Sequence, residues 1–522
     1  MKMLMLTMNP NKDKEDRISE LPDHIIHNIL RFIPIRTAAQ TMILSHRWKN
    51  VFSSIPDLDF TTIHVSPPPF NFMANDRDIN FLTNTLSLRD NSFTIRTLKL
   101  KSSQLSCMAF NFIMKYPKFI DIEELDVRVQ DTHYFNIPWS IIRRVRVLKL
   151  NIMFLHFDRL IIPSLMKREF KFLHTMILHQ VSFLLLFHDK HVFTDTLFPC
   201  LKKLRMEWCF RVQELTLRCS GLKDFIIKNC CDLNELDIYG LNLERLKVKN
   251  CFEDFSDHTK VKIIAPVLKV LKWVNVHSTR TSFHLEKSYL LEKVIISLLY
   301  KANLIPPKHV QELSNMMNAL SHARFLKFNY ASIEVFSLNE FILENKFENL
   351  RTLEITLEYS DLNGYNNFLV IATLLKNSPY LDTLGITIDR IYTGCHKCQM
   401  NDLNNDKYWE EQLPEMHSFL NHIRKVKLDV IFESYEDNIS LAKFLLKNGK
   451  VLEQMVLCIE LNTLLELARY KLMMSDLMKC SWASSKAKKR AVFSTSLLVS
   501  VTVIEKPVTD KASVKTFGEG YL

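Results

Sequence analysis

The sequence predicts an α/β protein in which a small N-terminal helical segment precedes a long solenoid of parallel strands. Two observations lead to this prediction. Residues 16–60 carry apolar residues at helical spacing, interrupted by prolines. From residue 96 onward, a short phrase of apolar, variable and apolar residues returns many times. Apolar residues two apart form half-buried strands, and their regular recurrence indicates stacked repeats.

Three short helices are expected between residues 16 and 60. Pro22 suits the first helical position, because its missing N–H would be unpaired there, and Asp23 favours the positive helix end. Pro34 stops this helix, and Ser45 is expected to cap the third. A block of about 45 residues is marginal as an independent fold, so a partner is expected. The apolar faces of the three helices are, in order, Ile25, Ile26, Ile29, Leu30 and Ile33; Ile35, Ala38, Ala39, Met42 and Ile43; and Trp48, Val51 and Phe52.

The same residues carry a resemblance to a known family. Leu21-Pro22-Asp23, the stretch LSHRW at 44–48 and the stretch PDLDF at 56–60 resemble a plant F-box. An F-box docks on the small acidic Skp-family adaptor of an SCF (Skp, cullin, F-box) ubiquitin ligase, so the resemblance implies an adaptor-binding surface. The alternative is that these residues only form a helical core. By motif position, the surface is assigned to Leu21, Pro22, Ile25, Ile29, Leu30, Ile33, Pro34, Leu44 and Trp48.

The composition is that of a soluble globular protein of a reducing compartment. The chain has 522 residues, 47% of them hydrophobic, yet no run approaches the roughly 20 apolar residues of a membrane span. The N-terminal residues have too short an apolar core for a signal peptide. The 11 cysteines are odd in number and lack a framework spacing, so cytosol or nucleus is expected.

Composition also disfavours catalysis and nucleic-acid binding. Only 8 glycines occur, and neither a P-loop nor a Gly-x-Gly-x-x-Gly fingerprint is present, which argues against a nucleotide-dependent enzyme. No paired carboxylates or nucleophile elbow stand out, so no catalytic residue and no cofactor is predicted. The net charge of +11 is spread thinly rather than gathered in the stripe of a nucleic-acid binder.

The repeated phrase extends over most of the chain. Recurrence at about 23 to 32 residues is the signature of leucine-rich repeats. In the middle, the leucine-like positions 215, 225, 236 and 246 are about ten residues apart, too close for one complete coil each. We therefore predict two strands per coil there, and helices on the convex side of the flanking coils, such as 368–375. The phrases begin at Thr97, Glu124, Val147, Thr175, Lys203, Glu214, Asp224, Glu235, Arg245, Val270, Lys293, Phe325, Thr352 and Thr383.

The array closes with a strand at 424–428, an amphipathic helix and a final strand at 452–457. Gly449 is expected to end the helix in the left-handed conformation. Residues 442–455 resemble the FBD segment that follows the repeats in many plant F-box proteins. The predicted organisation is a flexible leader at 1–15, an F-box at 16–60, a linker and connecting helix at 61–95, a solenoid at 96–413, FBD-like closing repeats at 414–460 and a basic, partly disordered tail at 461–522.

Three further features suggest a binding site, but each also has an ordinary structural interpretation. Cys395 and Cys398 have the spacing of half a zinc site, but no second ligand pair lies nearby, so no metal is predicted. The basic run 485–490 suits nuclear import or an anionic contact, although a solvated charge run is commoner. Lysines recur at outward positions of the strands, where an ordinary solvated face competes with an anion site. These lysines are Lys99, Lys149, Lys247, Lys272 and Lys327.

The resemblance implies a non-catalytic substrate-recognition subunit of an SCF-type ubiquitin ligase. Its expected partners are a Skp-family adaptor, through it the cullin and RING subunits, and a protein substrate of unknown identity. No membrane partner is expected. A protein-interaction scaffold unrelated to ubiquitination, or a nucleic-acid or anion binder acting through the basic tail, are the alternative functions.

Overall fold

The computed structural model describes residues 18, 20–61, 76–89, 92–102, 121–131, 143–154, 170–181, 193–252, 259–276, 281–298, 307–334, 343–358, 366–389, 405–430, 435–460, 475–477, 479–484 and 499–504. The predicted leader, the proline linker at 67–69, Cys395, Cys398 and the basic run 485–490 lie outside these residues. The chain divides into two compact units: unit 1 comprises 1–186 and 196–201, and unit 2 comprises 187–195 and 202–522.

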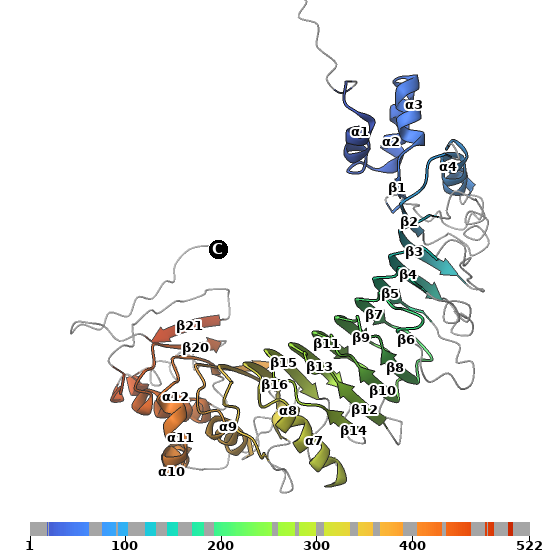
Figure 1. Cartoon of the computed structure of the whole chain (residues 1–522). Coiled ribbons are helices and arrows are strands. Elements are labelled where there is room, and N and C mark those ends of the chain that lie inside the picture. Colours follow the sequence, from blue (N-terminus) through green and yellow to red (C-terminus); the bar gives the residue numbers. More distant parts are fainter. Residues whose placement is uncertain are drawn as a thin grey trace, which may run out of the picture. The chain divides into compact units, whose positions relative to one another are not determined.

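Unit 1 contains the N-terminal helices and the first strands (Figure 1). Pro22 lies at the N-cap of the first helix rather than inside it, and that helix ends at Leu30, before the predicted Ile33. Pro34 is instead the N-cap of the second helix. The elements are α1 (Asp23–Leu30), α2 (Ile35–Gln40), η1 (Thr41–Ile43), α3 (His46–Ser53), β1 (Asp57–Asp59), α4 (Asp76–Ser87), β2 (Thr97–Ser102), β3 (Glu124–Asp131), β4 (Val147–Phe154) and β5 (Thr175–His179).

The strands of unit 1 form a parallel sheet in the order β1-β2-β3-β4-β5. The first leucine-like residue of every repeat occupies the same register position, so these side chains stack in one column. The five side chains of this column in unit 1 are at most 2% exposed. A stack of parallel strands with one buried column per repeat position is the architecture of a leucine-rich-repeat solenoid. The column consists of Leu58, Leu98, Leu125, Leu148 and Met176.

Unit 2 continues the repeats and adds helices (Figure 1). Its elements are β6 (Phe193–Thr194), β7 (Lys203–Glu207), β8 (Glu214–Arg218), β9 (Asp224–Lys228), β10 (Glu235–Tyr239), β11 (Arg245–Lys249), β12 (Thr259–Ile264), β13 (Val270–Val276), β14 (Thr281–Leu285), β15 (Lys293–Leu298), α7 (Pro307–Ala319), β16 (Phe325–Asn329), α8 (Tyr330–Glu334), β17 (Thr352–Glu358), α9 (Asn366–Lys376), β18 (Thr383–Asp389), α10 (Asn405–Glu411), α11 (Leu413–Leu420), β19 (Lys425–Val430), α12 (Tyr435–Asn448), β20 (Gln454–Glu460) and β21 (Val499–Ile504).

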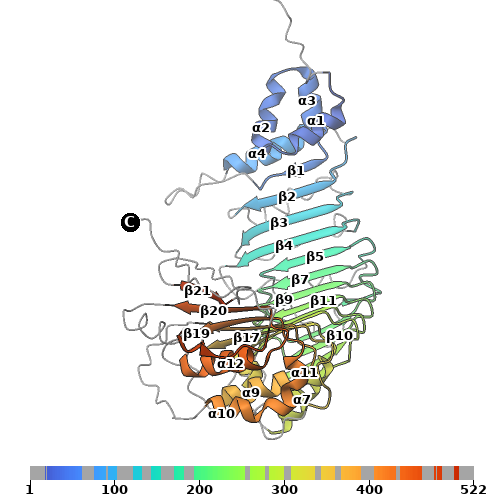
Figure 2. The ribbon, with the colours of Figure 1, turned by 90° about the vertical axis from the view of Figure 1, so that its left-hand side faces the viewer.

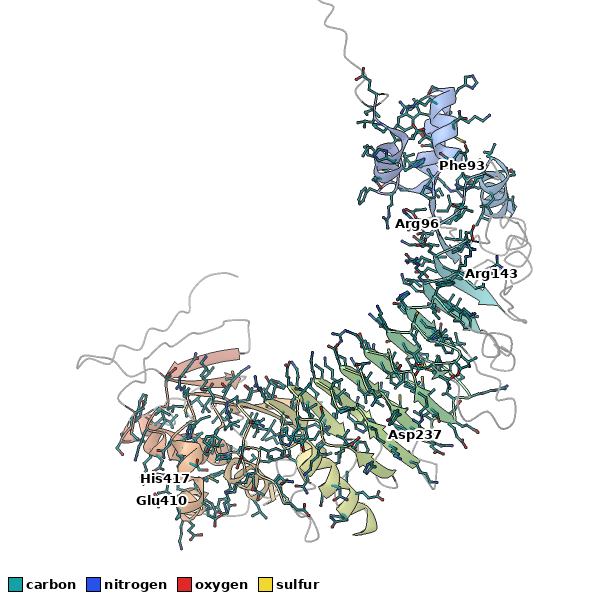
Figure 3. All side chains as sticks on the ribbon, viewed as in Figure 1. Phe93, Arg96, Arg143, Asp237, Glu410 and His417 are labelled. Atoms are coloured by element: carbon teal, nitrogen blue, oxygen red, sulfur yellow. The ribbon has the colours of Figure 1, made fainter. Side chains whose placement is uncertain are left out.

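Two sheets face each other in the first part of unit 2. The main sheet runs β7-β9-β11-β13-β15-β16-β17-β18-β19-β20-β21, and a second sheet runs β6-β8-β10-β12-β14. Alternate strands along the chain thus enter alternate sheets, which confirms the prediction of two strands per coil. Phe225 and Leu246 of the main sheet and Leu236 of the second sheet are at most 1% exposed. Figure 3 places Asp237 on the second sheet, in β10.

Helices replace the second sheet in the later coils of unit 2. Figure 2 shows α9, α11 and α12 against the strands β17 to β20, and α12 packs directly on β19. Trp409 of α10 is fully buried, and its ring centroid lies 5.7 Å from that of Phe444 in α12. The predicted helices are therefore confirmed for the later coils, whereas the connections between the strands β2 to β5 lie outside the described residues. β21 pairs antiparallel with β20, whereas the other described pairs of the sheet are parallel.

Gly449 follows α12, as predicted, but it does not adopt the predicted left-handed conformation. A Cβ atom at this position would lie 2.7 Å from the backbone oxygen of Leu445 and 3.5 Å from Cβ of Leu452. Close approach of the helix end, rather than a positive φ, therefore requires glycine. Left-handed residues occur instead after strands of the main sheet, at Trp208, Asn229 and Asn250, with φ of 55°, 51° and 49°.

Candidate functional site

A small apolar core holds the three N-terminal helices together. Each helix contributes two side chains that are at most 5% exposed: Ile26 and Leu30, Ile35 and Ala38, and Val51 and Phe52. His27 joins the first helix to the third, because its Nε2 lies 3.0 Å from the backbone oxygen of Val51 and 3.1 Å from Oγ of Ser54. These six buried side chains and the contacts of His27 hold α1, α2 and α3 together.

The Leu21-Pro22 turn that opens this segment is fixed by Arg47. The guanidinium of Arg47 donates a hydrogen bond to the backbone oxygen of Leu21 and forms an ion pair of 2.9 Å with Asp23. Ser45 caps α3 by accepting a hydrogen bond of 3.3 Å from the backbone N–H of Trp48, as the sequence predicts. Arg47 thus orients the apolar turn, a role that reasoning from the sequence did not assign.

Four large apolar side chains of the segment are exposed to solvent. Ile29 is 46% exposed, Phe32 88%, Ile43 87% and Leu44 67%. Ile29 lies in the last turn of α1, and Phe32 lies just beyond the end of that helix. Ile43 is the last residue of η1, and Leu44 follows it. Apolar groups this exposed gain free energy when a partner removes them from water. We call these four residues the exposed apolar set and take them as the centre of the candidate site.

The nine residues assigned to adaptor binding fall into three groups of exposure. The buried member, Leu30, is 5% exposed and belongs to the helical core, so it shapes the site without presenting its side chain. Phe32 and Ile43 of the exposed apolar set were not assigned. The role of the nine residues stays a prediction. The exposed members are Pro22, Ile29, Pro34 and Leu44, and the half-buried members are Leu21, Ile25, Ile33 and Trp48.

Asp57 connects the helical segment to the sheet. It opens β1, and Arg96, labelled in Figure 3, donates hydrogen bonds of 3.0 Å from Nε and 2.5 Å from Nη2 to its carboxylate. Burial raises the pKa of the Asp57 carboxyl, but hydrogen bonds from Arg96 and Thr97 and the charges of Arg96 and Arg31 outweigh this effect. The pKa therefore lies below the ordinary value of 3.8.

We expect Asp57→Asn to destabilise unit 1 in a pH-dependent way. Because the pKa of Asp57 is lower in the folded state, its contribution is complete above the unfolded-state pKa and is lost as the pH falls through the folded-state pKa. At pH about 7 the substitution should reduce the free energy of unfolding by about 1 to 3 kcal/mol, and this difference should shrink below pH about 4. Urea unfolding followed by circular dichroism across this range measures it.

Asp121→Asn is the matched control. Asp121 pairs with Arg144 at 2.6 Å, but both side chains are well exposed, at 40% and 56%. An exposed pair of this kind contributes about 0 to 1 kcal/mol. A loss of stability in Asp57→Asn that stays constant with pH, or that matches the loss in Asp121→Asn, would contradict the role given to Asp57.

The outward lysines of the main strands differ in their partners. Lys99 pairs with Asp59 at 3.4 Å, Lys149 with Glu124 at 2.7 Å, and Lys327 with Glu354 at 3.2 Å. These three side chains belong to an ordinary, charge-balanced solvated face. The two remaining lysines of this kind, Lys247 and Lys272, form no ion pair with any residue that the structure describes.

The His, Cys, Asp and Glu side chains of the described residues are the candidates for a metal site or a reactive thiol. Within them, no group of three or more His, Cys, Asp or Glu side chains could bind a metal ion. Burial raises the pKa of Cys219 to about 12 and that of Cys458 to about 11, so both thiols stay protonated at neutral pH. None of the described helices is both long and apolar enough to cross a membrane.

In this chain a helical segment with an exposed apolar set leads into leucine-rich repeats. The F-box domain model matches residues 18–59, and the FBD model matches residues 416–457. A protein of Arabidopsis thaliana named as an F-box/FBD/LRR-repeat protein is 34% identical over 491 residues, which cover 91% of this chain and 95% of the relative. The chain therefore belongs to the F-box/FBD/LRR-repeat family of plant proteins.

More distant relatives are similar over most of their length. A second F-box/FBD/LRR-repeat protein of Arabidopsis thaliana is 24% identical, covering 85% of this chain and 92% of the relative. An FBD-associated F-box protein of the same plant is also 24% identical, covering 86% and 89%. Proteins of this class are typically non-catalytic adaptors, and an F-box in general implies binding to a Skp-family adaptor.

Proposed function

We propose that this chain is the substrate-recognition subunit of an SCF-type ubiquitin ligase. The observation that carries the proposal is the exposed apolar set of Ile29, Phe32, Ile43 and Leu44 on an F-box segment. Such side chains are the usual anchors of a protein interface, since each gains free energy when it leaves water. A Skp-family adaptor is the partner that an F-box implies, and cullin and RING subunits join through the adaptor.

The mechanism is proximity rather than catalysis by this chain. The F-box holds the ligase core while the repeats bind a protein substrate, which raises the effective concentration of substrate lysines near the ubiquitin-charged enzyme. The adaptor interface is expected to bury about 1,200 to 2,000 Å². We place the complex in the cytoplasm, the nucleus or both, because the 11 cysteines without framework spacing favour a reducing compartment.

Co-expression with a plant Skp-family adaptor, followed by pull-down at moderate salt, tests the proposal. We expect the wild-type chain to co-purify with the adaptor and the double variant Leu21→Ala/Pro22→Ala to lose most of it. Phe93→Ala is the control, because Phe93 is 43% exposed in unit 1 but lies outside the F-box. A well-folded wild-type chain that does not retain the adaptor would overturn the proposal, as would equal retention by the double variant.

The purified complex also permits a functional readout. Addition of cullin, RING subunit, the ubiquitin-conjugating enzyme and ubiquitin should yield ubiquitin conjugates on the receptor chain itself, since its own lysines are held near the active enzyme. The Leu21→Ala/Pro22→Ala variant should give few conjugates. Conjugation that does not depend on the F-box residues would contradict the assigned architecture.

A further inference from the structure

The main sheet of unit 2 carries a basic cluster at its outward face. Lys247 of β11 lies beside Lys272 of β13, and Lys249 of β11 lies beside Lys228 of β9. Lys247 and Lys249 are two residues apart on one strand, so both point to the same face. Adjacent strands lie about 4.8 Å apart, so the amines of these four lysines, on three neighbouring strands, lie close together.

Three of these four amines form no ion pair with a residue that the structure describes. Lys228 pairs with Glu207, which also binds Arg205 at 2.8 Å. No ion pair joins Lys247, Lys249 or Lys272 to a described carboxylate. Burial and the charges of its three lysine neighbours lower the pKa of Lys247 by more than the charge of Glu207 raises it, so repulsion between the amines prevails there. Elsewhere on such faces Lys99, Lys149 and Lys327 are neutralised by carboxylates.

Apolar side chains flank the cluster on both sides. Ile226 of β9 lies next to Lys247 in register, and Ile295 of β15 lies next to Lys272. Both isoleucines are half-buried and face outward, because their neighbours Phe225, Ile227, Val294 and Ile296 fill the core. The row across four strands therefore reads apolar, basic, basic, apolar. Each isoleucine thus presents apolar surface beside the lysines.

We propose that this surface, formed by Ile226, Lys228, Lys247, Lys249, Lys272 and Ile295, binds an extended acidic segment of the substrate protein. Resting on the proposed function, this inference names the chemistry of the substrate. Three strand steps span about 14 Å, and an extended chain rises about 3.4 Å per residue. The two isoleucines are therefore about four residues of extended chain apart. The bound segment carries an apolar residue for each isoleucine, with aspartate or glutamate between them for the lysines.

Carboxylates fit the cluster better than a phosphate group does. Phosphate is typically held by the planar fork of arginine, which makes two parallel hydrogen bonds. Here the neighbouring arginines are already paired, Arg205 with Glu207 at 2.8 Å and Arg245 with Asp224 at 3.3 Å. Separate lysine amines on neighbouring strands match separate carboxylates along a chain, and charge complementarity of this kind fixes the register of the bound segment.

Fluorescence anisotropy on the full chain tests the proposal with a labelled peptide of sequence Gly-Ser-Leu-Asp-Glu-Asp-Leu-Ser-Gly. We expect binding that weakens with salt and that is about tenfold or more weaker for Lys247→Glu/Lys272→Glu. Lys327→Glu, on the same row of the same sheet, should change affinity less than about twofold, because Lys327 already has a carboxylate partner. Should the double variant misfold, Lys247→Met/Lys272→Met replaces it.

Several results would overturn the proposal. These are no peptide binding by the folded wild-type chain, equal binding by wild type and double variant, or equal binding of a peptide with Asn and Gln in place of the acids. A preference above about tenfold for a phosphoserine version, or for a single-stranded oligonucleotide, would also overturn it. Adaptor binding is measured in parallel. Retained adaptor binding without peptide binding defeats this inference alone. Peptide binding without adaptor binding defeats the proposed function, and with it the substrate role of the surface, but not the acidic-peptide site itself.

Discussion

Leu44→Asp should weaken binding to a Skp-family adaptor by about 100-fold or more. Leu44 is 67% exposed and follows η1, so a polar replacement meets water in the free protein and leaves the helical core intact. In the complex the same carboxylate would be taken out of water without a partner, which costs several kcal/mol. Bio-layer interferometry with immobilised adaptor measures the change, and circular dichroism verifies that the helices remain.

Leu88→Asp provides the matched control for this measurement. Leu88 is 46% exposed, belongs to the same unit and receives the same substitution, but it lies after α4 and outside the F-box. Its affinity for the adaptor should equal that of the wild type. If both variants bind the adaptor as tightly as the wild type does, the exposed apolar set is not the anchor of the interface.

Phe225→Ala should reduce the free energy of unfolding of unit 2 by about 3 to 5 kcal/mol. Phe225 is fully buried in β9, between the main sheet and the second sheet, so its removal leaves a cavity that the flanking strands cannot fill. Neighbouring repeats support one another, so the loss is felt by the adjacent coils. Urea unfolding followed by circular dichroism measures the loss.

The next residue on the same strand is the control for Phe225. Ile226 faces outward and is half-buried, so Ile226→Ala should cost about 1 kcal/mol or less. Adaptor affinity should stay unchanged in both variants, because the F-box segment belongs to unit 1. Similar destabilisation in the two variants would contradict the assignment of Phe225 to the core and of Ile226 to the outward face. Loss of adaptor binding in Phe225→Ala would contradict an F-box site that is separate from the repeats.

The repeats were predictable because their physics is local. Each phrase has two apolar residues separated by a variable one, and the period of two in a strand sends both into the core. The short steps around Phe225 and Leu236 left room for only one strand each, which led to the two-sheet arrangement. β12 and β14 were not predicted, although Val261 and Phe283 occupy the leucine-like positions of these strands.

The candidate site was predicted less completely, because exposure depends on packing between elements. Motif position assigned both Leu30 and Leu44 to the adaptor surface, yet Leu30 is 5% exposed and Leu44 is 67% exposed. Phe32 lies beyond the end of α1, where helical spacing no longer applies. The role of Arg47 depends on a contact between residues 26 positions apart, which a reading of local pattern does not reveal.

Gly449 and the basic cluster also depend on contacts between residues that are distant in the sequence or on different strands. The end of α12 suggested a left-handed glycine, whereas the approach of Leu445 and Leu452 is what excludes a side chain. The alternation of lysine along the strands was visible in the sequence. The pairing of Lys99, Lys149 and Lys327, and the lack of a described carboxylate partner for Lys247 and Lys272, emerges only when neighbouring strands are in register.

Hydrogen exchange of the full chain, measured alone and in the presence of a Skp-family adaptor, tests most directly whether the F-box segment is the ligase-binding site. We expect backbone amides within residues 21–54 to exchange about tenfold or more slowly in the complex, since bound helices open less often. Amides of β7 to β20 should be unchanged. Protection located in the repeats, or no protection in residues 21–54 of a chain that retains the adaptor, would contradict the assignment.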